Sequence, residues 1–307
     1  MKFGAFSAIL SKKEYEYINF KKNNSDKVLL KVTHYQTLSH NGEKTLINLF
    51  DNDNDYVYKI YKNSITNINL NPNLYKYFKE SIDKYDKDRI CKLLTSTRLI
   101  GYFIEDLGDF DVFDALTDLI YFKKNIWGEK NKFNDFIIHM CYALKYLESF
   151  QICHFDIKPE NIMIKNTLKL PFEKRFKLID FGFAEEYPFK NYSNKLIGTK
   201  YYVPYYQEHK EYPEWHLKIN CNDWYRDENY KLQHYIKKKQ EYNLIYKTDV
   251  FSLGMVFQHI LFYIKYYNKK KTKIENFENI ELLIKHMTHY DIEQRFTYNE
   301  CLNYLLK

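Results

Sequence analysis

The stretch of sequence that decides the fold is His154-Phe155-Asp156-Ile157-Lys158-Pro159-Glu160-Asn161. One short segment thus holds a carboxylate, a cation and an amide, on Asp156, Lys158 and Asn161. Phosphoryl transfer to a hydroxyl needs a carboxylate to orient the hydroxyl and accept its proton, a cation to neutralise phosphate charge, and an oxygen ligand for Mg²⁺. We therefore interpret these three side chains as candidate catalytic residues.

A second carboxylate follows farther along the chain, in Asp180-Phe181-Gly182. The apolar run Phe176-Lys177-Leu178-Ile179 before it predicts a strand that ends at this carboxylate. Mg²⁺ prefers one or two carboxylates together with phosphate oxygens, so Asn161 and Asp180 are the predicted metal ligands. A lone Asp-Phe-Gly is usually a turn and a lone His-x-Asp is usually structural, but the two motifs in this order and spacing are specific.

Two regions of different periodicity surround these motifs. The first is strand-like in the runs Val28-Leu29-Leu30, Thr45-Leu46-Ile47, Tyr56–Tyr61, Cys91–Leu94 and Leu99–Ile104. It also contains the start signal Asn71-Pro72, which predicts a helix to about Tyr85. Beyond Phe113 the apolar spacing becomes helical, most clearly over Phe133–Phe150. A ligand is expected in the cleft between the two regions.

Composition and charge exclude several classes of protein. With 45% hydrophobic and 28% charged residues, the chain has the balance of a soluble globular protein. The net charge of +7 comes from Lys spread from end to end, which argues against a nucleic-acid binder. The most apolar run, Val250–Tyr267, is interrupted by polar residues and indicates a buried helix, with no membrane span.

The five cysteines are scattered and form no Cys-x-x-Cys pair. That pattern argues against a disulfide framework or a zinc site and favours a reducing compartment. We expect an intracellular, cytoplasmic protein. The abundance of Tyr, Phe, Asn, Lys and Ile fits an AT-rich genome, such as that of a parasite or a large DNA virus, in which case the host cytoplasm or the virion is the expected location.

Taken together, the two motifs resemble those of the eukaryotic Ser/Thr protein kinases, and the resemblance extends over roughly residues 28 to 305. It implies an α+β bilobal fold, with a small antiparallel β-sheet lobe that carries one helix and a larger, mainly α-helical lobe. The implied organisation is an N-terminal extension at 1–27, an N-lobe at 28–107 and a C-lobe at 108–307 with an insert at about 207–240. The implied cofactors are ATP and Mg²⁺, and the implied partner is a protein substrate with Ser or Thr hydroxyls.

The resemblance also assigns nucleotide-binding residues. Lys59 matches the lysine that binds the α- and β-phosphates, and Glu80 is the candidate for the glutamate that pairs with it. Glu105 and Leu107 belong to the expected hinge that contacts adenine, and Asp111 matches the ribose-binding acid. Gly42 stands for the last glycine of the phosphate-covering loop.

Three further matches lie in the C-terminal half. Gly198-Thr199 resembles the loop that positions the substrate, and its threonine hydroxyl is expected on the catalytic aspartate. Asp249 resembles the acid that holds the catalytic loop's backbone, and Arg295 matches a late structural arginine. Lys158 and Thr199 favour Ser/Thr over Tyr as the acceptor.

The chain also departs from the family. The phosphate-covering loop keeps Gly42 alone of its glycines, which predicts weak ATP binding or slow turnover. Phe155 replaces the arginine that usually couples activation-loop phosphorylation to activity, so phosphorylation of Ser193 or Thr199 is not expected to be required. The aromatic-rich insert either contacts a partner or covers the lobe's own core.

Three readings remain open at this point. The first is an active Ser/Thr kinase, because Lys59, Asp156, Asn161 and Asp180 are all present. The second is a catalytically weak pseudokinase that acts as a binding or scaffold module, which the poor phosphate loop and the insert favour. The third is a small-molecule phosphotransferase, which the context of Lys158, Gly198-Thr199 and Asp249 disfavours.

Overall fold

The chain divides into two units in this computed structural model. Unit 1 comprises Met1–Asn54, Tyr58–Leu107 and Asp180–Ala184, and unit 2 comprises Asp55–Val57, Gly108–Ile179 and Glu185–Lys307. The structure describes residues 2–3, 7–17, 28–34, 54–58, 66–67, 72–80, 99–105, 108–117, 132–165, 170–186, 198–199, 201–203, 246–267, 277–289 and 291–307.

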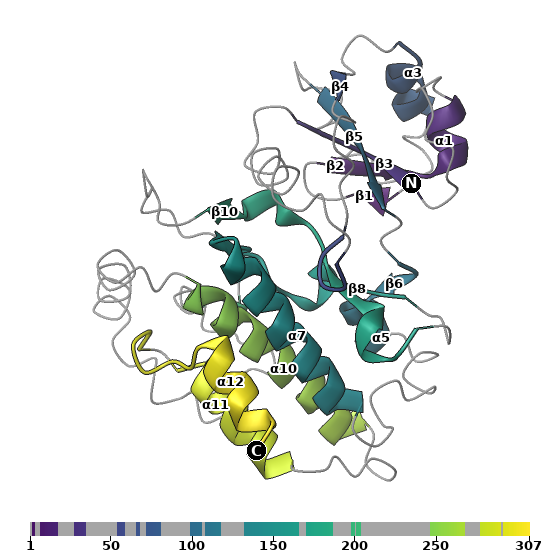
Figure 1. Cartoon of the computed structure of the whole chain (residues 1–307). Coiled ribbons are helices and arrows are strands. Elements are labelled where there is room, and N and C mark those ends of the chain that lie inside the picture. The colour runs from purple at the N-terminus through teal and green to yellow at the C-terminus, as the bar shows by residue number, and fades with distance from the viewer. Residues whose placement is uncertain are drawn as a thin grey trace. The chain divides into compact units, whose positions relative to one another are not determined.

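Unit 1 is built on a five-stranded antiparallel sheet in the order β1-β2-β3-β5-β4 (Figure 1). The strands are β1 (Lys2–Phe3), β2 (Ser7–Leu10), β3 (Val28–His34), β4 (Thr66–Asn67) and β5 (Leu99–Glu105). The long central pair sets the register, with Leu30 opposite Phe103 and Lys31 opposite Tyr102. Val32 and Leu30 are fully buried, as the β-branched and apolar character of this run predicts.

Two helices accompany this sheet, α1 (Lys12–Tyr17) and α3 (Pro72–Glu80) (Figure 1). Pro72 opens α3 as the start signal predicts, and Leu74 and Phe78 on one face are buried. The Tyr77 hydroxyl donates to Glu14 Oε1 at 2.9 Å, which ties α3 to α1. The expected helix at this position is confirmed as far as Glu80.

The sheet begins earlier in the chain than the sequence predicts. β1 and β2 form a hairpin, and β2 continues the sheet by pairing Leu10 with Leu30 of β3. Residues expected as an extension at 1–27 therefore include two strands of the sheet, and Ala8 and Leu10 are buried in its core. One division between the units falls between Leu107 and Gly108.

Unit 2 is mainly helical, with α5 (Val112–Thr117), α7 (Lys132–Ser149), α10 (Lys247–Tyr267), α11 (Phe277–Met287) and α12 (Tyr298–Leu305) (Figure 1). Helix α7 packs against both α10 and α12. Phe136 of α7 meets Phe176 with ring centroids 4.6 Å apart and Phe257 of α10 at 5.7 Å. Aromatic edge contacts of this kind add to the burial of large apolar surface and hold the core in one arrangement.

Short strands in unit 2 form two small sheets. β6 (Phe110–Asp111), β8 (Ile162–Ile164) and β9 (Phe176–Leu178) pair in the order β6-β8-β9, and β7 (Ile152–Cys153) pairs with β10 (Glu185–Glu186). The segment 154–161 therefore connects β7 to β8 and is held at both ends by strand pairing. The motif Asp180-Phe181-Gly182 follows β9, as the sequence predicts.

Among the described residues, Arg295 is the largest side chain that is fully buried, and its contacts connect segments of the C-terminal part of unit 2. Its Nε donates to the His289 carbonyl at 2.8 Å, its Nη1 donates to the Lys247 carbonyl at 2.9 Å, and its guanidinium lies over the Phe251 ring. A buried guanidinium is tolerated because several donors are satisfied. Glu208, the acidic partner considered for this arginine, lies outside the described residues.

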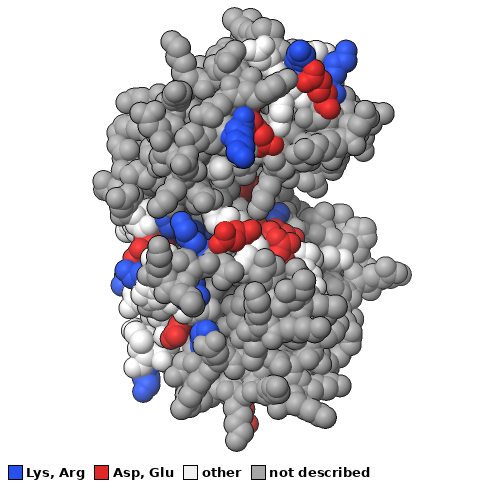
Figure 2. Space-filling view, turned by 90° about the vertical axis from the view of Figure 1, so that its right-hand side faces the viewer, with Lys and Arg blue, Asp and Glu red and all other residues white. Residues whose placement is uncertain are grey.

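Charged side chains of both signs are interspersed on the face shown in Figure 2, where the described Lys and Arg residues form no extended basic area. None of the described helices combines the length and the apolarity that a membrane span requires. The predicted strands at 45–47 and 91–94 and the insert at about 207–240 lie outside the described residues.

Gly254 of α10 lies close to the end of α11, where an added Cβ would lie 2.8 Å from Thr288 Cγ2 and 2.9 Å from Met287 Cβ. Gly254→Ala gains helix propensity but overpacks the α10–α11 contact, so we expect a net loss of about 1–2 kcal/mol in the free energy of unfolding. Thermal or denaturant unfolding measures it. Asn279→Ala, on the exposed face of α11, is the matched control and should stay within about 0.5 kcal/mol of wild type. Equal stability of the two variants would contradict the packing argument.

Candidate active site

The backbone of the 154–161 segment is held by one buried carboxylate. Asp249, in the first turn of α10, accepts the His154 N–H at 2.6 Å with one oxygen and the Phe155 N–H at 2.9 Å with the other. Phe155 has φ of 64°, a left-handed conformation that is costly for a bulky residue. Two charge-assisted hydrogen bonds in a buried setting stabilise that conformation. Asp249 thus does what the resemblance implies.

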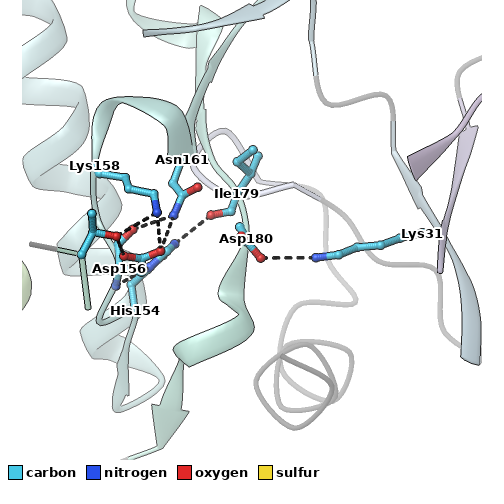
Figure 3. Close-up of polar contacts among 8 residues, drawn as sticks. Lys31, His154, Asp156, Lys158, Asn161, Ile179 and Asp180 are labelled. Carbon is cyan, nitrogen blue, oxygen red and sulfur yellow. Dashed lines mark hydrogen bonds and ion pairs between the residues drawn. The ribbon is translucent and has the colours of Figure 1, made fainter. Parts of the chain in front are cut away.

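Asp156 lies at the centre of a hydrogen-bonded cluster (Figure 3). Asn161 Nδ2 donates to its carbonyl at 2.7 Å and to its Oδ2 at 3.0 Å, and Lys158 Nζ lies 2.9 Å from the same Oδ2. The Thr199 hydroxyl donates to its Oδ1 and accepts from Lys158 Nζ at 2.8 Å. The structure therefore brings together the three predicted catalytic side chains and adds Thr199.

His154 links this cluster to the strand that leads to Asp180 (Figure 3). Its Nδ1 accepts the Asp156 N–H at 3.2 Å, and its Nε2 lies 2.9 Å from the Ile179 carbonyl oxygen. A carbonyl only accepts, so Nε2 carries the proton and the ring is the Nε2–H tautomer. The Ile179 N–H in turn donates to the Asn161 carbonyl at 2.9 Å. These hydrogen bonds connect both ends of the catalytic segment, at His154 and Asn161, to Ile179, the residue that directly follows β9.

Gly198 lets Thr199 approach Asp156. It has φ of +122°, and an added Cβ would lie 2.7 Å from the Phe155 carbonyl and 2.4 Å from Val203 Cγ1. Only glycine fits such a conformation in this space. The turn continues with the Tyr202 N–H donating to the Thr199 carbonyl at 3.1 Å.

The same turn contacts α10 through a buried pair. The Tyr202 hydroxyl and His259 Nδ1 lie 2.9 Å apart and share a hydrogen bond. Burial lowers the pKa of His259 from 6.5 to about 4 and raises the pKa of Tyr202, so both groups are neutral near pH 7. Phe113 and Tyr263 also lie against the His259 ring.

In unit 1, Lys31 of β3 reaches Asp180 (Figure 3). Its Nζ lies 3.5 Å from Asp180 Oδ1, and the side chain of Lys31 is only 4% exposed whereas that of Asp180 is 43% exposed. A buried lysine with a half-exposed carboxylate partner is unusual and marks a functional-site candidate. Asp180 itself has φ of 58°, which Asp tolerates better than most residues.

Sequence reasoning missed Lys31. The run Val28-Leu29-Leu30 was visible as a strand, and the lysine that follows it directly is the signal that could have found the residue. An apolar strand that carries one lysine between Leu30 and Val32 places the charge inside the sheet's buried part. Lys59, the predicted phosphate-binding lysine, lies outside the described residues, as do Gly42 and Leu107.

The remaining predicted nucleotide-binding residues have other local contacts. Glu80 is exposed and its Oε1 lies 3.8 Å from Lys76 Nζ within α3, which gives no support to a buried pairing with Lys59. Glu105 ends β5. Asp111 Oδ1 accepts the Asp114 N–H at 2.7 Å and so caps the start of α5.

The arrangement suits phosphoryl transfer chemically. The oxygens of Asp156 face a hydroxyl and an ammonium, so the site can hold an acceptor hydroxyl beside a cation. Asn161 uses its amide nitrogen on Asp156, which leaves its Oδ1 as the atom that can serve as a metal ligand. Fold and site together resemble the bilobal phosphotransferases that carry an Asp–Lys–Asn catalytic segment.

Comparisons with known proteins also find similarity to protein kinases. Residues 84–212 match the family model described as Protein kinase domain. The chain is 31% identical over 134 residues to MAP kinase-activated protein kinase 2 of Drosophila melanogaster, covering 43% of this chain and 32% of that protein. It is 39% identical over 125 residues to the serine/threonine-protein kinase dkf-2 of Caenorhabditis briggsae, covering 40% of this chain and 10% of that protein. The chain thus spans a third or less of these relatives.

Residues 84–212, less than half of the chain, thus carry the similarity to the protein kinase domain, and the relatives that the chain matches include a serine/threonine-protein kinase. The matched segment contains the Asp156 cluster, Asp180 and the Gly198 turn. The α+β bilobal fold implied by the resemblance is confirmed.

The lowered pKa of His259 makes stability depend on pH. Between about pH 4 and 6.5 the unfolded chain binds a proton at this histidine and the folded chain does not. The stabilisation is fully present above pH 6.5 and is lost as the pH falls towards 4, by up to about 3 kcal/mol. Denaturant unfolding between pH 4 and 7 should therefore give a flatter pH profile for His259→Asn than for wild type. Parallel profiles would contradict the assignment.

Proposed function

We propose that this chain is a protein kinase that transfers the γ-phosphate of Mg·ATP to Ser or Thr hydroxyls of protein substrates. The observation that carries the proposal is the Asp156 cluster, in which Lys158, Thr199 and Asn161 all bond one buried aspartate. An aspartate whose neighbours hold it in a single rotamer is preorganised to orient an acceptor hydroxyl and take its proton.

Each residue of the cluster has a distinct role in this proposal. Asp156 is the base for the acceptor hydroxyl, and Lys158 neutralises charge that develops on the transferred phosphoryl group. Thr199 holds both of them in place, because its hydroxyl bonds Asp156 and Lys158 together. The Lys158–Thr199 contact also supports Ser/Thr as the acceptor over Tyr.

For ATP and Mg²⁺ we propose contacts by Lys31 and Asp180, which belong to the same unit, and Asn161 stays a candidate metal ligand by its residue type. We assign the phosphate-binding role to Lys31 in place of Lys59, because Lys31 is a buried cation beside a predicted metal ligand. Oxygen donors from Asp180 and Asn161 are the ligand type that Mg²⁺ takes. When bound, the ion would neutralise phosphate charge during transfer.

The described cysteines, Cys141, Cys153 and Cys301, are buried thiols, which supports a reducing intracellular location as part of this proposal. The cytoplasm remains the proposed site of action.

Loss of the Asp156 base tests the activity directly. Asp156→Asn should lower kcat for transfer from Mg·[γ-³²P]ATP to generic protein substrates by about 10²–10⁴-fold, the usual contribution of a general base. Asp55→Asn, in an exposed ion pair with Lys174, is the matched control and should keep wild-type activity. The phosphorylated residues should be chiefly Ser and Thr.

If wild type transfers no more phosphate than Asp156→Asn while still binding ATP, the chain acts as a binding module and the proposal is wrong.

The same assay compares Lys31→Met with Lys59→Met to identify the lysine that binds phosphate. A larger loss for Lys31→Met supports the assignment of the phosphate contact to Lys31, and a larger loss for Lys59→Met returns it to Lys59.

Regulation follows from Phe155, which is 1% exposed and sits in the core with its backbone N–H on Asp249. A buried apolar ring at this place offers no charge to a phosphate on the activation loop. We expect phosphatase-treated enzyme to keep its kcat within about twofold of untreated enzyme, since the described contacts that hold the catalytic segment, such as those of Asp249, involve no phosphate. Activity that disappears on dephosphorylation and returns on rephosphorylation would contradict this.

A further inference from the structure

Helix α10 bears two buried polar side chains that reach the two halves of the catalytic cluster. Asp249 near its start holds the backbone of His154 and Phe155, and His259 farther along holds Tyr202. Both side chains are nearly inaccessible to solvent, at 3% exposure each. One helix therefore contacts both the segment that carries Asp156 and the turn that carries Thr199.

The described residues of the turn at 198–203, which are 198–199 and 201–203, belong to no helix or strand. Gly198 has φ of +122° and Tyr201 has φ of 73°, and the second is costly for an aromatic residue. Conformations of this kind persist only where surrounding contacts over-determine them. The turn's described anchors are the Thr199 hydroxyl on Asp156, the Tyr202 N–H on the Thr199 carbonyl, and the Tyr202 hydroxyl on His259.

Of these anchors, the Tyr202–His259 bond connects the turn to α10. Its surroundings are apolar and aromatic, because the His259 ring also meets Phe113 and Tyr263. A neutral hydrogen bond in such a site is strong and directional, and losing one partner leaves the other buried without it.

We propose that Tyr202 and His259 are a positioning pair that sets Thr199, and through it Lys158, against Asp156, so that α10 fixes the spacing between the two halves of the catalytic cluster. The pair touches neither substrate nor ATP in this account and acts through Thr199. The kinetic part of the inference rests on the proposed kinase activity.

The test compares Tyr202→Phe, His259→Leu and His259→Asn. Loss of the bond should lower kcat for protein phosphorylation by about tenfold or more in the first two variants, with the KM for ATP within about twofold of wild type. Asn offers an amide near the position of Nδ1, so His259→Asn should recover most of kcat. Tyr142→Phe, an exposed tyrosine of α7, is the matched control for a lost hydroxyl and should not change kcat.

A structural effect is separated from positioning by a double-mutant cycle. If the pair acts through Thr199, Tyr202→Phe should cost less than about twofold in a Thr199→Ala background. An equally large loss in that background, or a wild-type kcat in Tyr202→Phe, would overturn the inference.

Amide hydrogen exchange tests the anchor without any need for activity. Tyr202→Phe and His259→Leu should speed exchange of the Thr199 to Val203 amides by about tenfold or more, and His259→Asn should restore protection. Unchanged exchange refutes the anchor even if the enzyme is active. If wild type transfers no phosphate but amide exchange is faster in the variants, the proposed activity and the kinetic role of the pair are wrong. The role of the Tyr202–His259 bond as an anchor of the turn is then still supported.

Discussion

The hydrogen bonds from the His154 and Phe155 amides to Asp249 are the constraint on which the rest of the site depends. They hold Phe155 in a left-handed conformation that a bulky residue would otherwise leave. That conformation turns the chain so that Asp156 meets Asn161 and Lys158. The carboxylate of Asp249 can stay buried because both of its oxygens accept charge-assisted hydrogen bonds.

The catalytic cluster is assembled from segments far apart in the chain, and each joins it through backbone groups as well as side chains. His154 bonds the Ile179 carbonyl, and Gly198 packs against the Phe155 carbonyl. The reactive geometry thus depends on a core helix, a strand end and a turn that a Cβ would block. Precision of this kind is what preorganised catalysis requires.

In unit 1, local sequence patterns predict some of the strands and helices but not all of them. The β3 and β5 runs and the start of α3 follow from apolar content and the Asn71-Pro72 signal, and all three were predictable. The strands at Lys2–Phe3 and Ser7–Leu10 were not, because two- and four-residue strands have too little periodicity to identify. Their pairing with β3 decides that they belong to the sheet.

The sequence by itself identified the candidate residues of the site, because Asp156, Lys158, Asn161, Asp180 and the Gly198-Thr199 turn belong to short motifs that residue type and order specify. Which lysine meets Asp180 was decided only by the tertiary structure, because that pairing depends on the strand register that buries Lys31. The Tyr202–His259 bond likewise joins a turn to a helix distant in sequence. Such pairings depend on packing in three dimensions, and no local pattern specifies them.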